Sequence, residues 1–239
     1  MMKSMTYYQK KLRLSHNLSS MVDGIAFDDK DQFMLKLLEE LYAERRQNII
    51  TRQMKAANFP VIKTLDDYSF SGIQIPEKLS MEELKSLTFI QNKENLILYG
   101  GVGSGKTHLG IALGAIAIKQ EYVVLFFTVH ELVNQLVRSK EQNVYDKFLR
   151  KLCKAHLIIL DEWGYLPLHQ EGARLLFEVI SLCYEQCSLI ITTNIEFSHW
   201  KNFLFDEKLT AAIIDRIVHH SHLLFYDRSS YRKEHALMK

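Results

Sequence analysis

One short stretch constrains this chain more than any other. Residues 100–107 read Gly-Gly-Val-Gly-Ser-Gly-Lys-Thr and fit the phosphate-binding pattern G-x-x-x-x-G-K-[ST]. The pattern needs a strand before it and a helix after it. Here the apolar run Asn95–Tyr99 precedes it and a helix-forming run, Leu109–Ile118, follows it. The stretch therefore predicts a nucleoside triphosphate site between a strand and a helix.

Each residue of this loop has an expected task. Glycines permit backbone angles that turn successive N–H groups toward one anion. Lys106 would add positive charge near the β- and γ-phosphates, and Thr107 would offer its hydroxyl to Mg²⁺. The N-terminus of the following helix favours the same anion. We expect ATP and Mg²⁺ as cofactors, with nucleotide contacts from Gly100, Gly101, Val102, Gly103, Ser104, Gly105, Lys106, Thr107 and His108.

Strand and helix signals alternate from residue 65 onward. Apolar runs that read as buried strands are separated by segments with helical spacing, which is typical of a parallel sheet covered by helices on both faces. The expected strands are Asn95–Tyr99, Tyr122–Phe127, Leu157–Leu160, Ser188–Thr192 and His222–Tyr226. We therefore predict a doubly wound α/β fold for residues 65–239.

The first part of the chain reads as a small helical domain, residues 1–64. Residues 32–57 contain neither Pro nor Gly, and apolar residues recur there at helical spacing, so one long helix is expected. Asp31 or the pair Asp28-Asp29 could cap its N-terminus. Residues 66–76 look like an irregular connection.

Composition limits which binding surfaces and which cellular location can be expected. The chain has 239 residues and a formal net charge of +2, so any nucleic-acid surface must come from local clustering. Its three cysteines, Cys153, Cys183 and Cys187, have no zinc or disulfide pattern, and no apolar run reaches the about 18 residues of a membrane span. We expect a soluble, cytoplasmic protein with no membrane partner.

Two carboxylates follow the expected strand Leu157–Leu160. Asp161 would hold Mg²⁺, and Glu162 would orient or deprotonate the water that attacks the γ-phosphate. Asn194 follows the next expected strand, whose end should lie beside that of the Asp161 strand. Asn194 could reach the γ-phosphate or the attacking water, or it could simply begin a turn.

Together these residues resemble the AAA+ ATPases, and more closely the transposition helper ATPases of insertion sequences (the IstB family) and their relatives, the DnaC helicase loaders. The resemblance covers most of the chain. The stretches that carry it are Phe59-Pro60, Lys63–Phe70, Gly100–Leu109, Phe126–Thr128, Leu132–Leu136, Asp161–Leu168, Thr192–Asn194 and Asp215–Ser221. It implies a P-loop AAA+ domain, an ATP-dependent oligomer, and an arginine supplied to each nucleotide by a neighbouring subunit.

Arg216 is the position that matches this arginine. The resemblance also leads us to expect the ending Gly-x-Ser-Tyr-Arg, whereas this chain has Arg228 in place of the glycine. Arg232 then matches a second sensor that contacts nucleotide within its own subunit. Few residues follow the last strand, so a reduced or absent C-terminal lid is expected.

Two basic segments are candidate DNA surfaces. Residues 138–154 carry six basic and two acidic residues, a local charge of six minus two, or +4. A second set, at the end of the long helix, comprises Arg45, Arg46, Arg52 and Lys55. Either could instead be a solvated face. Neither a cysteine nor a carboxylate is paired with His219, His220 and His222 in the sequence, so we assign them no metal.

The resemblance implies a helper that binds duplex DNA without reading its sequence, oligomerises on it, hydrolyses ATP, and recruits or stimulates a transposase. Lys106, Glu162, Asn194 and Arg216 would carry the hydrolysis. Two alternatives stay open at this point. One is a DnaC-like loader of a replicative helicase, and the other is an ATP-switched DNA adaptor that hardly hydrolyses ATP.

Overall fold

The computed structural model describes residues 5–26, 29–66 and 68–234. The chain divides into two compact units, residues 1–53 and 54–239, and the division falls inside the long helix α3 (Lys30–Ala57). The first unit contains α1 (Met5–Leu12), α2 (Leu18–Gly24) and most of α3. The functional boundary expected near residue 65 stays a prediction.

The long helix begins close to its expected start. The Asp29 carboxylate accepts a hydrogen bond of 2.9 Å from the amide of Gln32, which satisfies one of the free N–H groups of the first turn. Asp28, the other member of the expected capping pair, lies outside the described residues. A single Pro- and Gly-free helix over this segment is therefore confirmed.

The second unit is built on a six-stranded sheet with the order β1-β6-β2-β5-β4-β3. All pairings are parallel except that between β1 and β6. Because five strands run the same way, their carboxyl ends meet at one edge of the sheet. These strands are β2 (Asn95–Gly100), β3 (Val124–Thr128), β4 (Leu157–Trp163), β5 (Ser188–Thr193) and β6 (Ser221–Tyr226).

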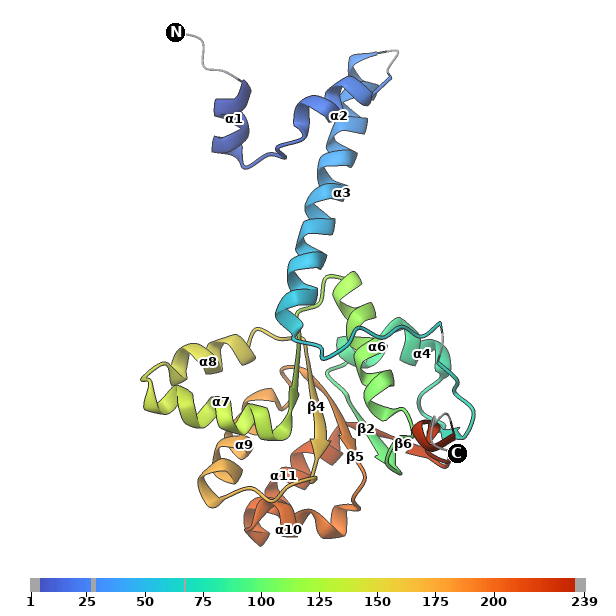
Figure 1. Cartoon of the computed structure of the whole chain (residues 1–239), viewed down its shortest axis with the longest axis vertical. Coiled ribbons are helices and arrows are strands. Elements are labelled where there is room, and N and C mark those ends of the chain that lie inside the picture. Colours follow the sequence, from blue (N-terminus) through green and yellow to red (C-terminus); the bar gives the residue numbers. More distant parts are fainter. Residues whose placement is uncertain (1–4, 27–28, 67, 235–239) are drawn as a thin grey trace. The chain divides into compact units, whose positions relative to one another are not determined.

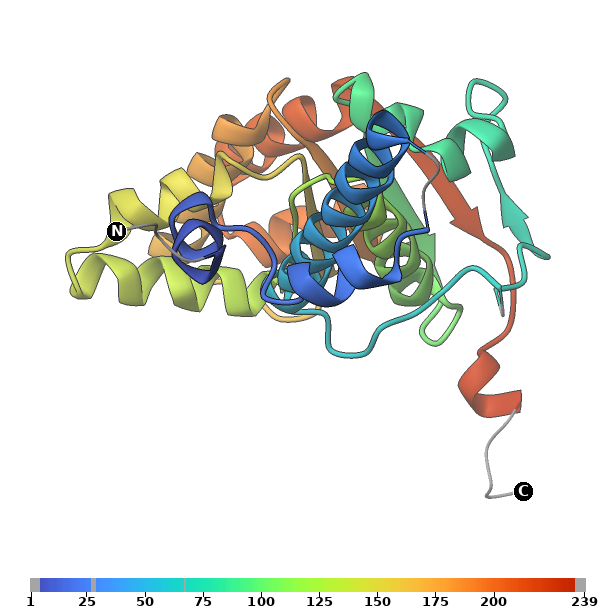
Figure 2. The same ribbon diagram turned by 90° about the horizontal axis from the view of Figure 1, so that it is seen from above.

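Helices cover both faces of this sheet (Figures 1 and 2), as the alternating pattern predicts. On one face, α6 (Lys106–Lys119) packs so closely that a Cβ at Gly114 would lie 2.9 Å from the Cδ1 atom of Ile159. The neighbouring residues Ile158 and Leu160 point to the other face, as strand alternation requires, and belong to its core. That core includes residues of α7 (Val129–Glu141), α9 (Gln170–Cys183) and α11 (Glu207–His219).

The connections hold several short elements. They are α4 (Met81–Ser86), α5 (Thr88–Gln91), α8 (Tyr145–Leu152), a 3₁₀ turn (Phe197–His199) and α10 (Trp200–Leu204). The stretch expected to be irregular contains the two-residue strand β1 (Ile73–Gln74), which is too short to show a period. After β6 the described residues form only α12 (Tyr231–Glu234).

Among the described residues, none of the helices combines the length and apolar character that crossing a bilayer needs.

Candidate nucleotide site

The phosphate-binding loop joins the end of β2 to the start of α6. Gly103 and Gly105 have φ angles of +78° and +88°, a left-handed conformation that glycine adopts without strain. Gly100 is needed for space as well, since a Cβ there would lie 2.6 Å from the Cβ of Tyr226. The buried Ser104 hydroxyl donates to the Gly101 carbonyl at 2.8 Å and closes the loop. Local backbone geometry thus explains the glycines of the motif.

Lys106 folds back over this loop. Its Nζ donates to the carbonyls of Gly100, at 2.8 Å, and Gly101, at 2.6 Å. Burial lowers the pKa of Lys106 to about 8, the Asp161 carboxylate opposes that shift, and the charges of Arg232 and Arg228 add to it. An anion at this place would favour the charged ammonium. A phosphate bound beside Lys106 would therefore stabilise the charged form of its side chain.

Asp161 joins three elements of the site through one oxygen. Its Oδ1 accepts a hydrogen bond of 2.8 Å from the Thr107 hydroxyl of α6 and another from the Thr192 hydroxyl of β5. The Asp161 side chain is buried, at the end of β4. Converging hydroxyl and carboxylate oxygens are the ligands that Mg²⁺ prefers, so Thr107 and Asp161 fit the metal expected from the sequence.

Glu162 lies on a bulge that turns it away from the sheet. The register between β4 and β5 shifts between Leu160 and Trp163, and Glu162 has a φ of +60°. Bulges of this kind re-aim side chains next to functional sites. The Glu162 amide donates to the Thr192 hydroxyl at 3.1 Å, and fully buried Trp163 anchors the next position. Glu162 is consequently exposed between two buried neighbours.

The electrostatic surroundings of Glu162 favour proton uptake. Although its side chain is largely exposed, loss of water on the protein side raises the pKa of this carboxyl, and the charges of Asp161 and Glu131 raise it further. A raised pKa brings the basicity of a carboxylate closer to that of an effective general base.

The remaining predicted residues of this edge lie around the loop. Asn194 is exposed just past β5, the strand between β2 and β4, so it follows the expected position. His108 Nε2 lies 2.8 Å from the Thr64 carbonyl, and its ring centre lies 5.0 Å from that of Tyr68. The Val102 side chain is exposed, and the Arg232 side chain passes close to Gly103, where an added Cβ would lie 3.4 Å from Nε.

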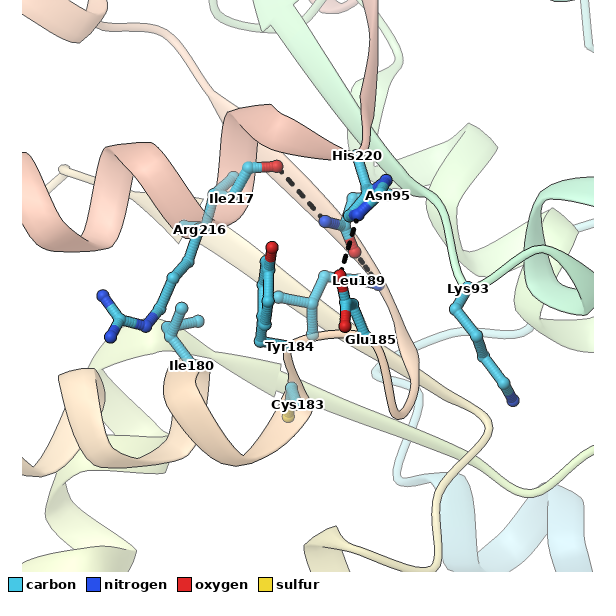
Figure 3. A pocket seen from close by; sticks show the side chains of 10 residues that line it. All are labelled: Lys93, Asn95, Ile180, Cys183, Tyr184, Glu185, Leu189, Arg216, Ile217 and His220. Carbon is cyan, nitrogen blue, oxygen red and sulfur yellow. Dashed lines mark hydrogen bonds and ion pairs between the residues drawn. The ribbon is translucent and has the colours of Figure 1, made fainter.

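Arg216 lies away from the phosphate loop of its own chain. It sits near the end of α11 and lines a pocket together with Lys93, which precedes β2, and Asn95, the first residue of β2 (Figure 3). Its guanidinium donates to the Ala212 carbonyl at 2.9 Å and lies 4.9 Å from the Phe177 ring centre. The five residue steps of β2 separate the two edges of the sheet by about 16 Å. Arg216 is therefore remote from the phosphate loop of the same chain.

The histidines beside Arg216 do have carboxylate partners. His220 lies 3.2 Å from Glu185, and His222 lies 3.0 Å from Glu94. Glu185, His219 and His220 also bring their ligand atoms within 4.8 Å of one another. The interpretation that no carboxylate accompanies these histidines is thus wrong, because the partners come from segments that are distant in sequence.

Sequence reasoning missed two contributors to the site. Thr192 binds both Asp161 and the Glu162 amide, and Thr193 donates to the Trp163 carbonyl at 2.9 Å. Two threonines at the end of a buried apolar strand were the available signal, since buried hydroxyls need partners. Arg228, noted only as a departure, donates to the Ser104 carbonyl at 2.6 Å.

Asp161→Asn tests the proposed metal ligand. The substitution keeps the shape but removes the charge, so it should weaken Mg²⁺ binding by on the order of 10-fold or more. ATP affinity measured by calorimetry should then gain little from Mg²⁺, while affinity in EDTA should hold or rise because repulsion of the phosphates falls. The exposed Asp146→Asn is the matched control. An undiminished Mg²⁺ gain in Asp161→Asn would contradict the assignment.

Known proteins of one kind match nearly the whole chain. The family model described as IstB-like ATP binding protein matches residues 12–238. A protein of Geobacillus stearothermophilus named for ATP binding in insertion sequence IS5376 is 37% identical, over 84% of this chain and 80% of that protein. A protein of Pseudomonas aeruginosa named for ATP binding in insertion sequence IS21 is 35% identical, over 93% of this chain and 85% of that protein.

A solved structure shares the fold. The crystal structure of the DnaC helicase loader covers 73% of this chain and 98% of its own, with a TM-score of 0.53 and 22% identity. The phosphate loop, the strand order and these matches agree, and the chain belongs to the family of IstB-like ATP binding proteins.

Proposed function

We propose that this protein is an ATP-hydrolysing transposition helper that assembles on duplex DNA and recruits or stimulates a transposase. One observation carries the proposal: the groups expected to bind and cleave a triphosphate lie at one edge of the sheet, while Arg216 lies at the other. The names of the two relatives, which refer to insertion sequences, support a role beside a transposase.

The arrangement at the carboxyl edge supports hydrolysis. The loop amides and Lys106 hold the triphosphate, and Mg²⁺ held by Thr107 and Asp161 would offset charge on the phosphates. Glu162 orients the attacking water and accepts its proton, helped by its raised pKa. Asn194, exposed just past the end of the neighbouring strand β5, hydrogen-bonds the water or the γ-phosphate.

The position of Arg216 supports assembly. Its guanidinium cannot serve the loop of its own chain across the length of β2. In an oligomer, the Arg216 edge of one subunit faces the carboxyl edge of the next and delivers the guanidinium to the γ-phosphoryl. Such an arginine makes hydrolysis depend on the neighbour, because it neutralises charge that develops only in the transition state.

DNA binding is assigned to α8. Its apolar residues Phe148, Leu149 and Leu152 pack against the core, which fixes the orientation of the helix. The opposite face presents exposed cations: Lys147, Arg150, Lys151 and, in the turn that follows, Lys154. By contrast, Lys140 lies 3.9 Å from Glu171 and over the Tyr145 ring. A stripe repeated in every subunit would track phosphates without reading bases.

Glu162→Gln tests the hydrolytic part of the proposal. ATP turnover with duplex DNA should fall by on the order of 10² or more, because the amide cannot accept the proton. ATP affinity should stay within about 3-fold of the unsubstituted protein, a difference in binding free energy of well under 1.4 kcal/mol. Glu196→Gln, an exposed glutamate after β5, is the matched control. Unchanged turnover would instead favour an ATP-switched adaptor.

Replacing Lys147, Arg150 and Lys151 together by Gln tests the α8 surface. Affinity for duplex DNA of random sequence should drop, and the slope of log K against log salt should become shallower by about 2.7, for three lost phosphate contacts. The comparison variant replaces Arg45, Arg52 and Lys55, from the second basic set. If only that variant lost affinity, the α8 assignment would be wrong.

The identity of the partner separates the helper from a helicase loader. Both would use the same ATPase, so the test is which protein the ATP-bound, DNA-bound form retains. We expect the transposase of the same insertion element. Retention of a replicative helicase in its place would overturn this part of the proposal.

A further inference from the structure

The guanidinium of Arg228 joins three segments of the chain. Its Nε donates to the carbonyl of Ser104 in the phosphate loop at 2.6 Å. Its Nη1 donates to the Ser69 carbonyl at 2.7 Å and the Ser71 carbonyl at 3.3 Å, and Nη2 donates to the Tyr68 hydroxyl at 3.1 Å. Arg228 itself follows β6. The loop, residues 68–71 and the end of β6 therefore share one side chain.

Two tyrosines hold this guanidinium in place. The Cζ of Arg228 lies 5.3 Å from the ring centre of Tyr68 and 5.3 Å from that of Tyr226. The two hydroxyls lie 3.1 Å apart, and burial raises the pKa of Tyr68, which keeps that phenol neutral. The planar fork of an arginine suits such a combined stacking and hydrogen-bonding site, whereas a lysine ammonium does not.

The contact with Ser104 orients one donor of the phosphate loop. The chain contains no cis peptide among its described residues, so the Ser104 carbonyl and the Gly105 N–H point in opposite directions across one planar unit. Holding the carbonyl toward Arg228 turns the Gly105 N–H the other way. A Cβ at Gly105 would lie 2.5 Å from Nη2 of Arg228, so this glycine also makes room for the guanidinium.

We propose that Arg228 is a positioning residue of the nucleotide site. It fixes the Ser104–Gly105 peptide so that the Gly105 N–H is presented to the phosphates, and it ties that peptide to residues 68–71. A donor that is already oriented binds more tightly, because no ordering cost remains to be met on binding. The inference rests on the proposed function only for ATP binding, and needs neither DNA nor an oligomer.

Arg228→Gly and Arg228→Lys test the inference, with ADP and a non-hydrolysable ATP analogue as probes in calorimetry. Arg228→Gly should raise the Kd of both nucleotides by about 10-fold, or 1.4 kcal/mol. Arg228→Lys should not restore affinity, since one ammonium cannot reach Ser104, Ser69 and Tyr68 together. Lys208→Ala, an exposed lysine of α11, is the control and should bind as the unsubstituted protein does.

A purely structural role would shift the melting temperature but leave the Kd of the folded protein unchanged, and that result would overturn the inference. Full rescue by Arg228→Lys would also overturn it, because charge alone would then suffice. If Arg228→Gly does not fold, Arg228→Gln keeps part of the aliphatic stem but removes the guanidinium, and it carries the same expectation. Failure of the unsubstituted protein to bind either nucleotide would overturn the proposed function itself.

Discussion

The Asp161 carboxylate is the contact on which the site depends. It accepts hydrogen bonds from Thr107 at the start of α6 and from Thr192 in β5, and so joins the phosphate loop to the ends of two strands. This is possible because β5 lies between β2 and β4 in parallel register. A buried carboxylate needs such donors, since leaving its charge unpaired away from water is costly. The sheet therefore fixes where the Thr107 hydroxyl and the Asp161 carboxylate meet, which is where the proposed Mg²⁺ would be held.

The same parallel register separates the site from Arg216. Strands that bring the loop and the carboxylates to one edge necessarily leave the end of α11 at the other edge, near His220 and the start of β2. Under the proposed function, a single subunit therefore has no Arg216 guanidinium at its own triphosphate site. Under the proposed function, this separation makes DNA-directed assembly the step that controls turnover.

Much of the fold could be predicted because its signals are local. The phosphate loop has a fixed spacing, and buried parallel strands read as apolar runs, so β2 to β6 fall where the sequence predicts them. β1 was missed because it has only two residues and exists through pairing with β6. The start of the long helix, next to Asp29, could also be predicted from local capping.

The parts of the site that escaped prediction depend on contacts between distant residues. Thr192 matters because it meets Asp161, which lies 31 positions away, and although a buried threonine signals that some partner exists, the residues around it do not say which. Arg228 stood out only as an arginine where glycine was expected, and its task follows from Ser104, Ser69 and Tyr68. Glu185 likewise meets His220 through the fold alone.

The most direct test of this account mixes two inactive variants. An Arg216→Ala subunit keeps its phosphate loop, and a Lys106→Ala subunit keeps its arginine, so each should be nearly inactive alone. When both are mixed on duplex DNA, the arginine of the second should serve the loop of the first, and ATP turnover should rise well above that of either variant alone. Turnover in the mixture equal to the average of the two separate variants would contradict an arginine supplied by a neighbouring subunit.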